Sequence, residues 1–351
     1  MKIKIITIHA IPNFGSVFQC YALCEHLKKQ GFEDVQVIDY NPKYFQVSSL
    51  RAKLGQCLNF GSYRRRTKKF RSFIEKNIPL THKSYCNVEE LKNAGIEADV
   101  YIAGGDQLWN VYYACGQDDA YKLTWVSGKK ISYGTSLGQT DFADWQIQEL
   151  AEKVRDFSAI AVRESSSVPL LAQAGIQATH CVDPVFLLEP SHYETFLKPV
   201  NQPKYLLVYL VSPSKLLDDC IAYLSKKHNL KVILCSGFRK KCACDEHLKD
   251  LGPDEVLSYI KNAEIVLSSS FHATAFSMIF RKQFFTILPD EHTNERITDI
   301  LAIRGLSDHV ITEKSDLTTA LDAQADYEAL ESYLPNIESA KDYLNSALNK
   351  E

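Results

Sequence analysis

The amino-acid sequence predicts an α/β protein made of two domains, each built around a parallel β-sheet. Short apolar segments typical of buried strands alternate along the chain with segments of helical periodicity. The alternation begins a second time after a proline-containing connection at residues 188–203. In addition, 351 residues are too many for one ordinary hydrophobic core.

The first series of elements lies before that connection. Helices are expected at residues 16–31, 50–77, 142–156 and 165–174. Such alternation is typical of a parallel sheet that helices cover on both faces. The apolar segments predict strands at residues 2–9, 35–40, 99–105, 130–136, 158–164 and 178–184.

The second series follows the connection. Strands are expected at residues 205–211, 231–236, 264–270 and 284–288, and helices at residues 214–228, 254–262, 272–280 and 294–304. Two successive series predict two Rossmann-like domains with parallel sheets that face each other across a cleft. We expect an N-terminal domain at 1–190, a C-terminal domain at 191–326 and closing helices at 327–351.

Composition excludes two classes of protein. A net charge of −3 argues against a general nucleic-acid binder, which would be basic. No run of 18 apolar residues is present, so no membrane-spanning helix is expected. The N-terminal segment lacks a full apolar region and a cleavage site, which favours a first strand over a signal peptide and predicts a cytoplasmic protein.

The ten cysteines are expected to be free thiols, mostly buried. Cys242 and Cys244, with His247 nearby, match a zinc site only weakly, because such a site needs four ligands. We therefore expect no metal.

In open parallel sheets, ligands bind at the carboxyl ends of the strands. The first predicted strand is followed by Asn13, Gly15 and Ser16 at a helix start. Glycine permits close backbone approach, and a helix N-terminus attracts anions. Taken alone, this segment is better explained as a turn with Ser16 as the helix cap.

Two further strand ends in the first series carry polar groups. Gly104 and Gly105 precede Asp106 and Gln107, and Asn110 adds an amide. Two interpretations stay open for the neighbouring Trp109, a stacking wall and a part of the core.

Arg163 and Glu164 end another strand. Arginine there suits bidentate recognition of a carboxylate or phosphate, and a surface pair of the two residues is an equal alternative.

In the second series, Ser268, Ser269 and Ser270 end a strand and His272 opens a helix. Hydroxyls and helix N–H groups there would hold an anion, and the histidine would move a proton. The alternative is that the serines cap the helix and His272 is part of the core. Arg296, near the start of a later helix, points to the cleft or into solvent.

The ordered set of motifs resembles the polysaccharide pyruvyl transferase family. The motifs that carry the resemblance are "TIHAIPNFGSVFQCYAL", "GGDQLWN", "AVRESS", "VDPVFLL", "SSSFHATAFSMIFRKQFF" and "NERITDIL". Each is weak alone, but in order they cover residues 7 to about 301. Gly105 stands where the family commonly has serine, and Ala273 where it commonly has glycine.

The resemblance implies a fold similar to the GT-B glycosyltransferases. It also implies transfer of a pyruvyl group from phosphoenolpyruvate to two hydroxyls of a sugar, which gives a cyclic ketal and phosphate. The sugar would belong to a cell-surface polysaccharide or its lipid-linked precursor, and His272 would be the functional histidine. The N-terminal domain would then be the acceptor side and the C-terminal domain the donor side.

This chemistry is consistent with the strand-end residues. Phosphoenolpyruvate carries a carboxylate and a phosphate, which Arg163, Arg296 and the helix start at Ser270 would bind. His272 is the hypothetical acid and base. Acceptor or donor contacts are expected from Asn13, Asp106 and Gln107, and the scheme needs no metal or cofactor.

Residues 62–71 hold six basic side chains interleaved with aromatic ones. Such a helix would contact an anionic membrane surface or the pyrophosphate of a lipid-linked sugar. A solvated helix face is the preferred alternative. Liposome binding that ignores anionic lipid content would exclude the membrane contact.

Two other functions stay open at this stage. One is a glycosyltransferase that uses a nucleotide sugar on the same fold. The other is a binding protein that has kept the fold without catalysis, although intact motifs at several strand ends argue against it.

Overall fold

The computed structural model describes residues 1–45, 59–209, 213–237, 242–288, 295–328 and 334–349, which form two compact units. Unit 1 contains the described residues of 1–45, 74–188 and 334–349, and unit 2 those of 59–73 and 189–328. The chain passes from unit 1 to unit 2 between Leu188 and Glu189, at the start of the predicted connection. The predicted domains are each continuous in sequence, whereas the compact units are not. Residues 59–73 belong to unit 2 although they precede most of unit 1, and residues 334–349 belong to unit 1 although they follow unit 2.

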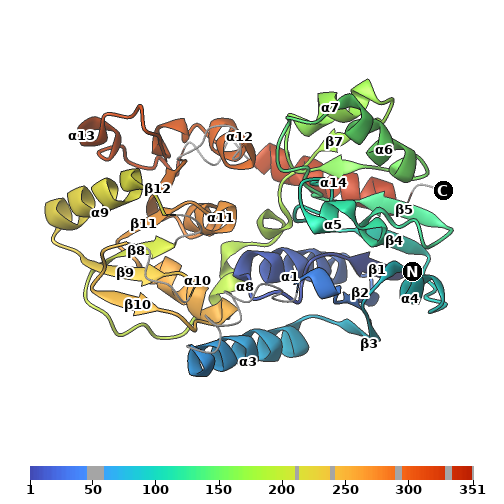
Figure 1. The fold of residues 1–351 in the computed structure, drawn as a ribbon, viewed down its shortest axis with the longest axis horizontal. Coiled ribbons are helices and arrows are strands. Elements are labelled where there is room, and N and C mark those ends of the chain that lie inside the picture. The colour runs from blue at the N-terminus through green and yellow to red at the C-terminus, as the bar shows by residue number, and fades with distance from the viewer. Residues whose placement is uncertain (46–58, 210–212, 238–241, 289–294, 329–333, 350–351) are drawn as a thin grey trace. The chain divides into compact units, whose positions relative to one another are not determined.

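Unit 1 is built on a parallel five-stranded sheet with the order β3-β2-β1-β4-β5 (Figure 1). Apolar strand residues are buried on both faces of its central strand, as a parallel sheet requires. A two-stranded parallel sheet, β6-β7, is joined to β5 by an isolated bridge between Ile131 and Ala159. The strands are β1 (Lys2–Ile6), β2 (Asp34–Tyr40), β3 (Leu80–Tyr85), β4 (Val100–Ala103), β5 (Lys129–Ser132), β6 (Ala161–Val162) and β7 (Thr179–His180).

The helices of unit 1 cover this sheet, and α1 lies against β2. One apolar cluster joins the sheet to the segment after β4 and to α6, with Trp109, Tyr121 and Leu150 fully buried in it. The helices are α1 (Phe14–Lys29), α4 (Val88–Lys92), α5 (Ala114–Gln117), α6 (Asp144–Val154), α7 (Ser167–Gln173) and α14 (Leu334–Asn349), with short 3-10 turns η1 (Lys43–Phe45), η2 (Asp119–Lys122) and η3 (Pro184–Phe186).

Unit 2 is built on a parallel six-stranded sheet with the order β10-β9-β8-β11-β12-β13. Two parallel-sheet units confirm the predicted α/β class. The strands are β8 (Tyr205–Tyr209), β9 (Lys231–Cys235), β10 (Glu246–Leu248), β11 (Ile265–Ser268), β12 (Gln283–Ile287) and β13 (Val310–Ile311).

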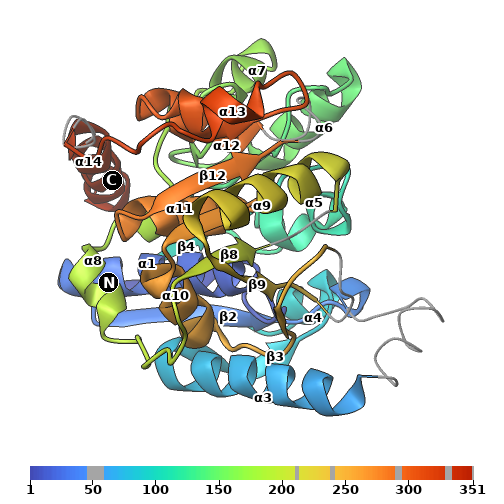
Figure 2. The same ribbon diagram turned by 90° about the vertical axis from the view of Figure 1, so that its left-hand side faces the viewer.

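The helices of unit 2 begin and end where their sequence signals predict. Ser214 caps α9 by accepting from the N–H of Leu217, and Asn229 ends it in the left-handed conformation. Pro253 opens α10 at its first position. Helix α9 packs on β8 and β9 (Figure 2). The helices are α3 (Phe60–Asn77), of which residues 60–73 belong to unit 2 and residues 74–77 to unit 1, α8 (Pro190–Glu194), α9 (Lys215–His228), α10 (Pro253–Asn262), α11 (Phe271–Ile279), α12 (Glu295–Ile303) and α13 (Leu317–Ala320), with the turn η5 (Ser307–His309).

Only part of the predicted helix 50–77 can be compared, because residues 50–58 lie outside the described ranges. Nine cysteines are described, none of them forms a disulfide within the described residues, and most are buried, as expected. Across the described ranges, no group of three or more His, Cys, Asp or Glu side chains is placed to hold a metal. None of the described helices combines the length and apolarity needed to cross a bilayer.

Helix α14 returns the end of the described chain to unit 1. Tyr343 donates to the carbonyl of Ser132 at 3.0 Å, and Lys129 donates to the carbonyl of Leu348 at 3.0 Å. His26 of α1 is buried, and charged groups of α14 act on it. Burial lowers the pKa of His26 to about 4, and the positive charge of Lys341 contributes in the same direction.

This pKa makes stability depend on pH. His26 becomes protonated below about pH 6.5 in the unfolded chain, but only below about pH 4 in the folded chain. Stability from this group is therefore complete above pH 6.5 and is lost as the pH falls toward 4, by about 3 kcal/mol in total. Urea unfolding at pH 7 and pH 4.5 should show a smaller loss in His26→Leu than in the wild type. Equal losses in the two proteins would contradict this assignment.

Candidate functional site

Both units place polar residues where their strand order reverses. In unit 1, β1 has β2 on one side and β4 on the other, so the chain segments that leave β1 and β4 diverge at the carboxyl edge of the sheet. In unit 2, β8 and β11 stand in the same relation. Ligands of open α/β sheets bind at such points. The predicted residues at Asn13–Ser16 and Asp106 follow β1 and β4, and those at Ser270–His272 follow β11.

The segment after β1 ends in a capped helix. Asn13, not Ser16, is the N-cap of α1, because its Oδ1 accepts from the N–H of Gly15 at 3.0 Å. The alternative in which Ser16 caps the helix is therefore wrong. Ser16 is fully buried in the first turn and donates its hydroxyl to Oδ2 of Asp106 at 2.5 Å.

Asp106 occupies a turn that few residues adopt. Its φ is +77°, in the left-handed region that aspartate tolerates better than most residues. The other carboxylate oxygen, Oδ1, accepts from the N–H of Gln107 at 2.8 Å. Ser16 and this N–H thus hold a nearly buried carboxylate in one orientation at the end of β4.

Gly105 allows Gln19 to approach the backbone of this turn. A Cβ at Gly105 would lie 2.7 Å from Oε1 of Gln19 and 3.0 Å from Pro184, so a larger residue would displace both. Gln19 donates through Nε2 to Oγ1 of Thr7 at 2.9 Å and to the carbonyl of Ser16 at 2.8 Å. Gln19 was not singled out from the sequence, although it lies in the "GSVFQ" motif.

The remaining polar groups after β4 form a short chain of hydrogen bonds. Nδ2 of Asn110 donates to Oε1 of Gln107 at 2.9 Å. Trp109 is fully buried, and its Nε1 donates to the carbonyl of Tyr121 at 3.2 Å. Of its two sequence interpretations, the core one is confirmed and the stacking wall is wrong.

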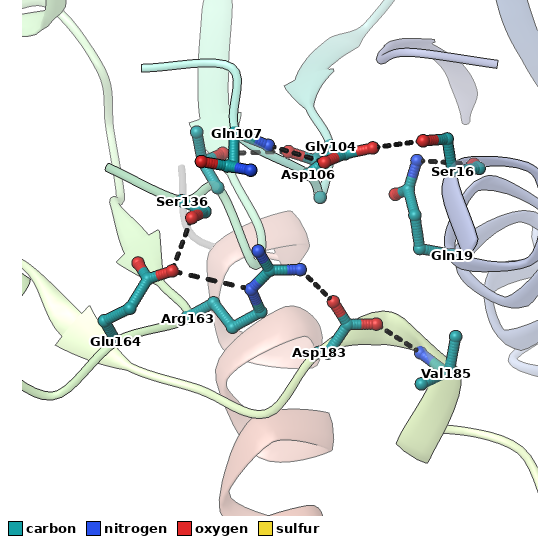
Figure 3. Close-up of polar contacts among 12 residues, drawn as sticks. Ser16, Gln19, Gly104, Asp106, Gln107, Ser136, Arg163, Glu164, Asp183 and Val185 are labelled. Atoms are coloured by element: carbon teal, nitrogen blue, oxygen red, sulfur yellow. Dashed lines mark hydrogen bonds and ion pairs between the residues drawn. The ribbon is translucent and has the colours of Figure 1, made fainter. Parts of the chain in front are cut away.

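Arg163 lies in the interior of unit 1 rather than at its surface. Its Nη1 is 2.5 Å from Oδ2 of Asp183, and its Nε is 3.6 Å from Oε1 of Glu164 (Figure 3). All three residues are buried, so the alternative of a surface pair is wrong. Burial acts to lower the pKa of Arg163, but the carboxylates around it, Asp183 first, raise that pKa above its usual value.

Asp183 is the residue of this cluster that the sequence did not reveal as a site residue. It follows β7 and precedes Pro184, and its Oδ1 accepts from the N–H of Val185 at 3.0 Å. Glu164 in turn accepts from the hydroxyl of Ser136. The charge of Arg163 is therefore balanced inside unit 1, and the predicted role of this residue in donor binding stays a prediction.

In unit 2, the stretch after β11 leads directly into the start of α11. Ser270 holds the N-cap position of α11, but its side chain makes no capping hydrogen bond. Instead, Oγ of Ser268 accepts from the N–H of Ser270 at 2.9 Å. His272 lies in the first turn, is 6% exposed, and stands edge-on to the ring of Phe271. A helix start of this kind favours a bound anion.

Two arginines belong to unit 2 near these elements. Arg296 is half-buried near the start of α12, which packs against α11. The charge of Arg66, in α3, influences the pKa values of the last residues of β8 and β9. Burial raises the pKa of Cys235 to about 12, and the positive charge of Arg66 opposes that rise. Arg66 also opposes the burial-induced rise in the pKa of Tyr209, so its charge acts at the carboxyl ends of β8 and β9.

The basic residues at 62–71 are thus divided among different environments. Arg65 pairs with Asp250 at 2.5 Å and Lys69 with Glu255 at 2.7 Å, both within unit 2. Arg64, Lys68 and Arg71 are exposed. Membrane contact through this helix stays a prediction.

The sequence also matches a model of a protein family. The model for polysaccharide pyruvyl transferases matches residues 13–291, which is well over half of the chain. The chain belongs to the polysaccharide pyruvyl transferase family. Among curated proteins, none matches the chain in sequence.

Solved structures support the fold of this family member. UDP-GlcNAc 2-epimerase from Methanocaldococcus jannaschii, in complex with UDP-GlcNAc and UDP, is similar with a TM-score of 0.52 at 15% identity, over 100% of this chain and 94% of that one. HepE from Anabaena, in complex with UDP and glucose, has a TM-score of 0.51 at 12% identity over 100% of both chains. At these identities the likeness concerns the fold alone, and that fold is GT-B-like, as predicted.

The buried ion pair suggests a test of what Arg163 does. Removing the charge of Asp183 in Asp183→Asn leaves a buried guanidinium less well balanced, and we expect a loss of about 3–5 kcal/mol in the free energy of unfolding. Urea denaturation measures it.

The matched control removes an exposed pair. Glu89→Gln breaks the contact with Lys92 on the surface and should change stability by less than about 1 kcal/mol. If Asp183→Asn is as mild as this control, the Arg163 charge does not depend on Asp183.

Proposed function

We propose that this protein transfers a pyruvyl group from phosphoenolpyruvate to two hydroxyls of a sugar, forming a cyclic ketal and releasing phosphate. The observation that carries the proposal is the family match over residues 13–291. The sugar belongs to a cell-surface polysaccharide or to its lipid-linked precursor, and the reaction takes place in the cytoplasm.

Unit 2 is the donor side of this proposal. Phosphoenolpyruvate brings a phosphate and a carboxylate, which need cationic groups and N–H donors. The start of α11 at Ser270 offers N–H groups and the positive end of a helix dipole. Arg296 and the charge of Arg66 add cationic groups in the same unit.

The chemistry requires one protonation and two attacks. His272 protonates the methylene carbon of phosphoenolpyruvate, while one sugar hydroxyl adds to the central carbon. The bond from that carbon to the phosphate oxygen then breaks, and phosphate leaves with the electron pair. The second hydroxyl closes the ring. One hydroxyl proton restores His272 and the other leaves with phosphate, so the step needs no oxidant, metal or cofactor.

Unit 1 is the acceptor side. Asp106, with its carboxylate oriented by Ser16, and the amide of Gln107 bind sugar hydroxyls. Asn13 and Gly15 hold the helix start beside them. Because Asp183 and Glu164 already balance Arg163, we assign Arg163 a positioning role.

A second candidate is a glycosyltransferase that uses a nucleotide sugar. The observation that favours it is the fold likeness to structures solved with UDP. The likeness is confined to the fold, whereas the family match concerns the sequence itself, so we place pyruvyl transfer first.

Replacing His272 tests the chemical role. In His272→Ala, phosphate release from phosphoenolpyruvate with an acceptor sugar should fall by about 10²–10⁴-fold, as expected for loss of an acid and base. Ser277→Ala, on the same buried helix, is the matched control and should keep its activity. Full activity in a folded His272→Ala protein would remove His272 from the mechanism.

Donor binding separates the two candidate functions. Phosphoenolpyruvate should raise the melting temperature of the wild-type protein, because a ligand of the native state stabilises it, and UDP-glucose and UDP-N-acetylglucosamine should not. A shift with UDP-sugars and none with phosphoenolpyruvate would favour the glycosyltransferase. No shift with either donor would favour a binding protein without catalysis.

A further inference from the structure

Unit 1 contains a pocket whose lining includes none of the residues assigned so far to the proposed reaction. It has a volume of about 290 Å³ and lies between the segment 111–122 and helix α6. This volume is at the lower end of the range for small-molecule sites, about 300–1,000 Å³, so the pocket suits a ligand about as large as one sugar ring.

One wall of the pocket is an exposed tryptophan. Trp145, in the first turn of α6, is 66% exposed, whereas Trp109 and Trp125 are buried. Tyr112 and Tyr113 lie in the chain between the lining residues Val111 and Gly116 and are each more than half exposed. A rigid ring with an apolar face and a polar edge is suited to stack on the C–H face of a sugar, and exposed aromatic side chains gathered in one region mark binding surfaces.

The polar groups of the pocket are held in place by hydrogen bonds that leave part of each group available. Oε1 of Gln146 accepts from the N–H of Ala143 at 2.9 Å, which leaves the amino group of its amide as a donor. Nε2 of Gln117 donates to the carbonyl of Val111 at 3.1 Å, which leaves its oxygen as an acceptor. Sugar hydroxyls need both kinds of partner.

The charges of the pocket balance one another. Lys153 contacts Glu149 at 2.8 Å and Asp119 at 2.9 Å. Nζ of Lys122 donates to the carbonyl of Gly116 at 2.7 Å and lies 3.8 Å from Asp119. Two ammonium groups therefore meet two carboxylates, which favours a neutral ligand over an anion such as phosphate.

The same stretch of chain connects this pocket to Asp106. Asn110 contacts Gln107 through its amide nitrogen, and its Oδ1 accepts from the N–H of Tyr112 at 3.1 Å. Gly116 packs so closely on the backbone of Asn110 that a Cβ there would lie 1.9 Å from its carbonyl oxygen. The turn that holds Asp106 and the wall of the pocket thus belong to one hydrogen-bonded segment, 106–117.

We propose that this pocket binds a neutral sugar ring, which stacks on Trp145 and bonds to Gln117, Gln146 and Glu149. The role of the pocket rests on the proposed function: it is a subsite for a second sugar of the acceptor saccharide, adjacent in that saccharide to the sugar that is modified. Binding of the sugar itself does not depend on that function.

The exposed position of Trp145 gives a direct readout. We would titrate the wild-type protein with methyl glycosides of glucose, galactose, mannose and N-acetylglucosamine and follow acrylamide quenching of tryptophan fluorescence. At least one glycoside should protect the accessible tryptophan saturably. In Trp145→Ala, loss of the stacked ring should weaken binding of that glycoside, measured by calorimetry, at least about tenfold.

Two controls keep the test specific. Gln148→Ala changes an exposed residue of α6 that does not line the pocket and should bind as the wild type does. Unchanged urea unfolding of Trp145→Ala would show that the fold is intact. The proposal is overturned if no glycoside of the panel protects tryptophan, or if calorimetry shows equal binding in Trp145→Ala.

The activity assay separates this inference from the proposed function. With phosphoenolpyruvate and a disaccharide acceptor, Trp145→Ala should raise the KM for the acceptor and leave the KM for phosphoenolpyruvate unchanged. If phosphoenolpyruvate is not a substrate but glycosides still protect Trp145, the proposed function fails and the sugar site stands. If pyruvyl transfer occurs with an unchanged acceptor KM, the subsite role fails and the function stands.

Discussion

The reversal of strand order in each sheet is the constraint on which the candidate sites depend. A parallel strand is followed by a connection that returns to the opposite edge of the sheet, so the connections of neighbouring strands normally run to the same side. Where the order reverses, between β1 and β4 or between β8 and β11, they diverge and leave the carboxyl ends of two strands accessible. Ser16 and Asp106, 90 positions apart in the chain, meet at 2.5 Å for this reason.

Buried polar groups then determine how the carboxyl edge of unit 1 is held. Arg163 N–H donates to the carbonyl of Thr135, and Oγ1 of Thr135 donates to the carbonyls of Ala103 and Gly104. The ends of β4, β5 and β6 are therefore linked by side chains and backbone together. A buried arginine is tolerated there because Asp183 and Glu164 compensate its charge. Burying these charged groups costs desolvation free energy, and the ion pairs that offset this cost also fix the geometry of the three side chains.

The sequence predicted most of the fold, and the strands that it did not predict share one property. β3 is an edge strand of unit 1, and β10 and β13 are the edge strands of unit 2. An edge strand buries fewer side chains, so its sequence lacks the apolar run of a central strand. The segment "LTHKSY" of β3 is polar along most of its length and only Tyr85 is fully buried. The central strands, buried on both faces, were all found.

Site residues were harder to interpret than strands, because one residue type serves several purposes. The strand-end position of Arg163 predicts an anion site, but the sequence does not show that Asp183, 20 residues later, folds against it. Likewise, Ser16 stands where a cap is common, yet Asn13 takes that role three positions earlier. Long-range partners decide each case, and no local pattern contains them.

The tryptophans show that helical periodicity does indicate from the sequence whether a large side chain is buried or exposed. In α6 the buried residues are Ile147, Leu150, Ala151 and Val154, a helical stripe that faces the core. Trp145 lies outside this stripe, two residues before its first member, so the period of the helix alone directs it toward solvent. Trp109, in a segment without a helical period, offers no such contrast. A large aromatic side chain on the polar face of an amphipathic helix exposes apolar surface to water. This exposure is unfavourable, and the folding of the helix onto the core does not require it. For such a residue, binding explains the exposure better than packing does.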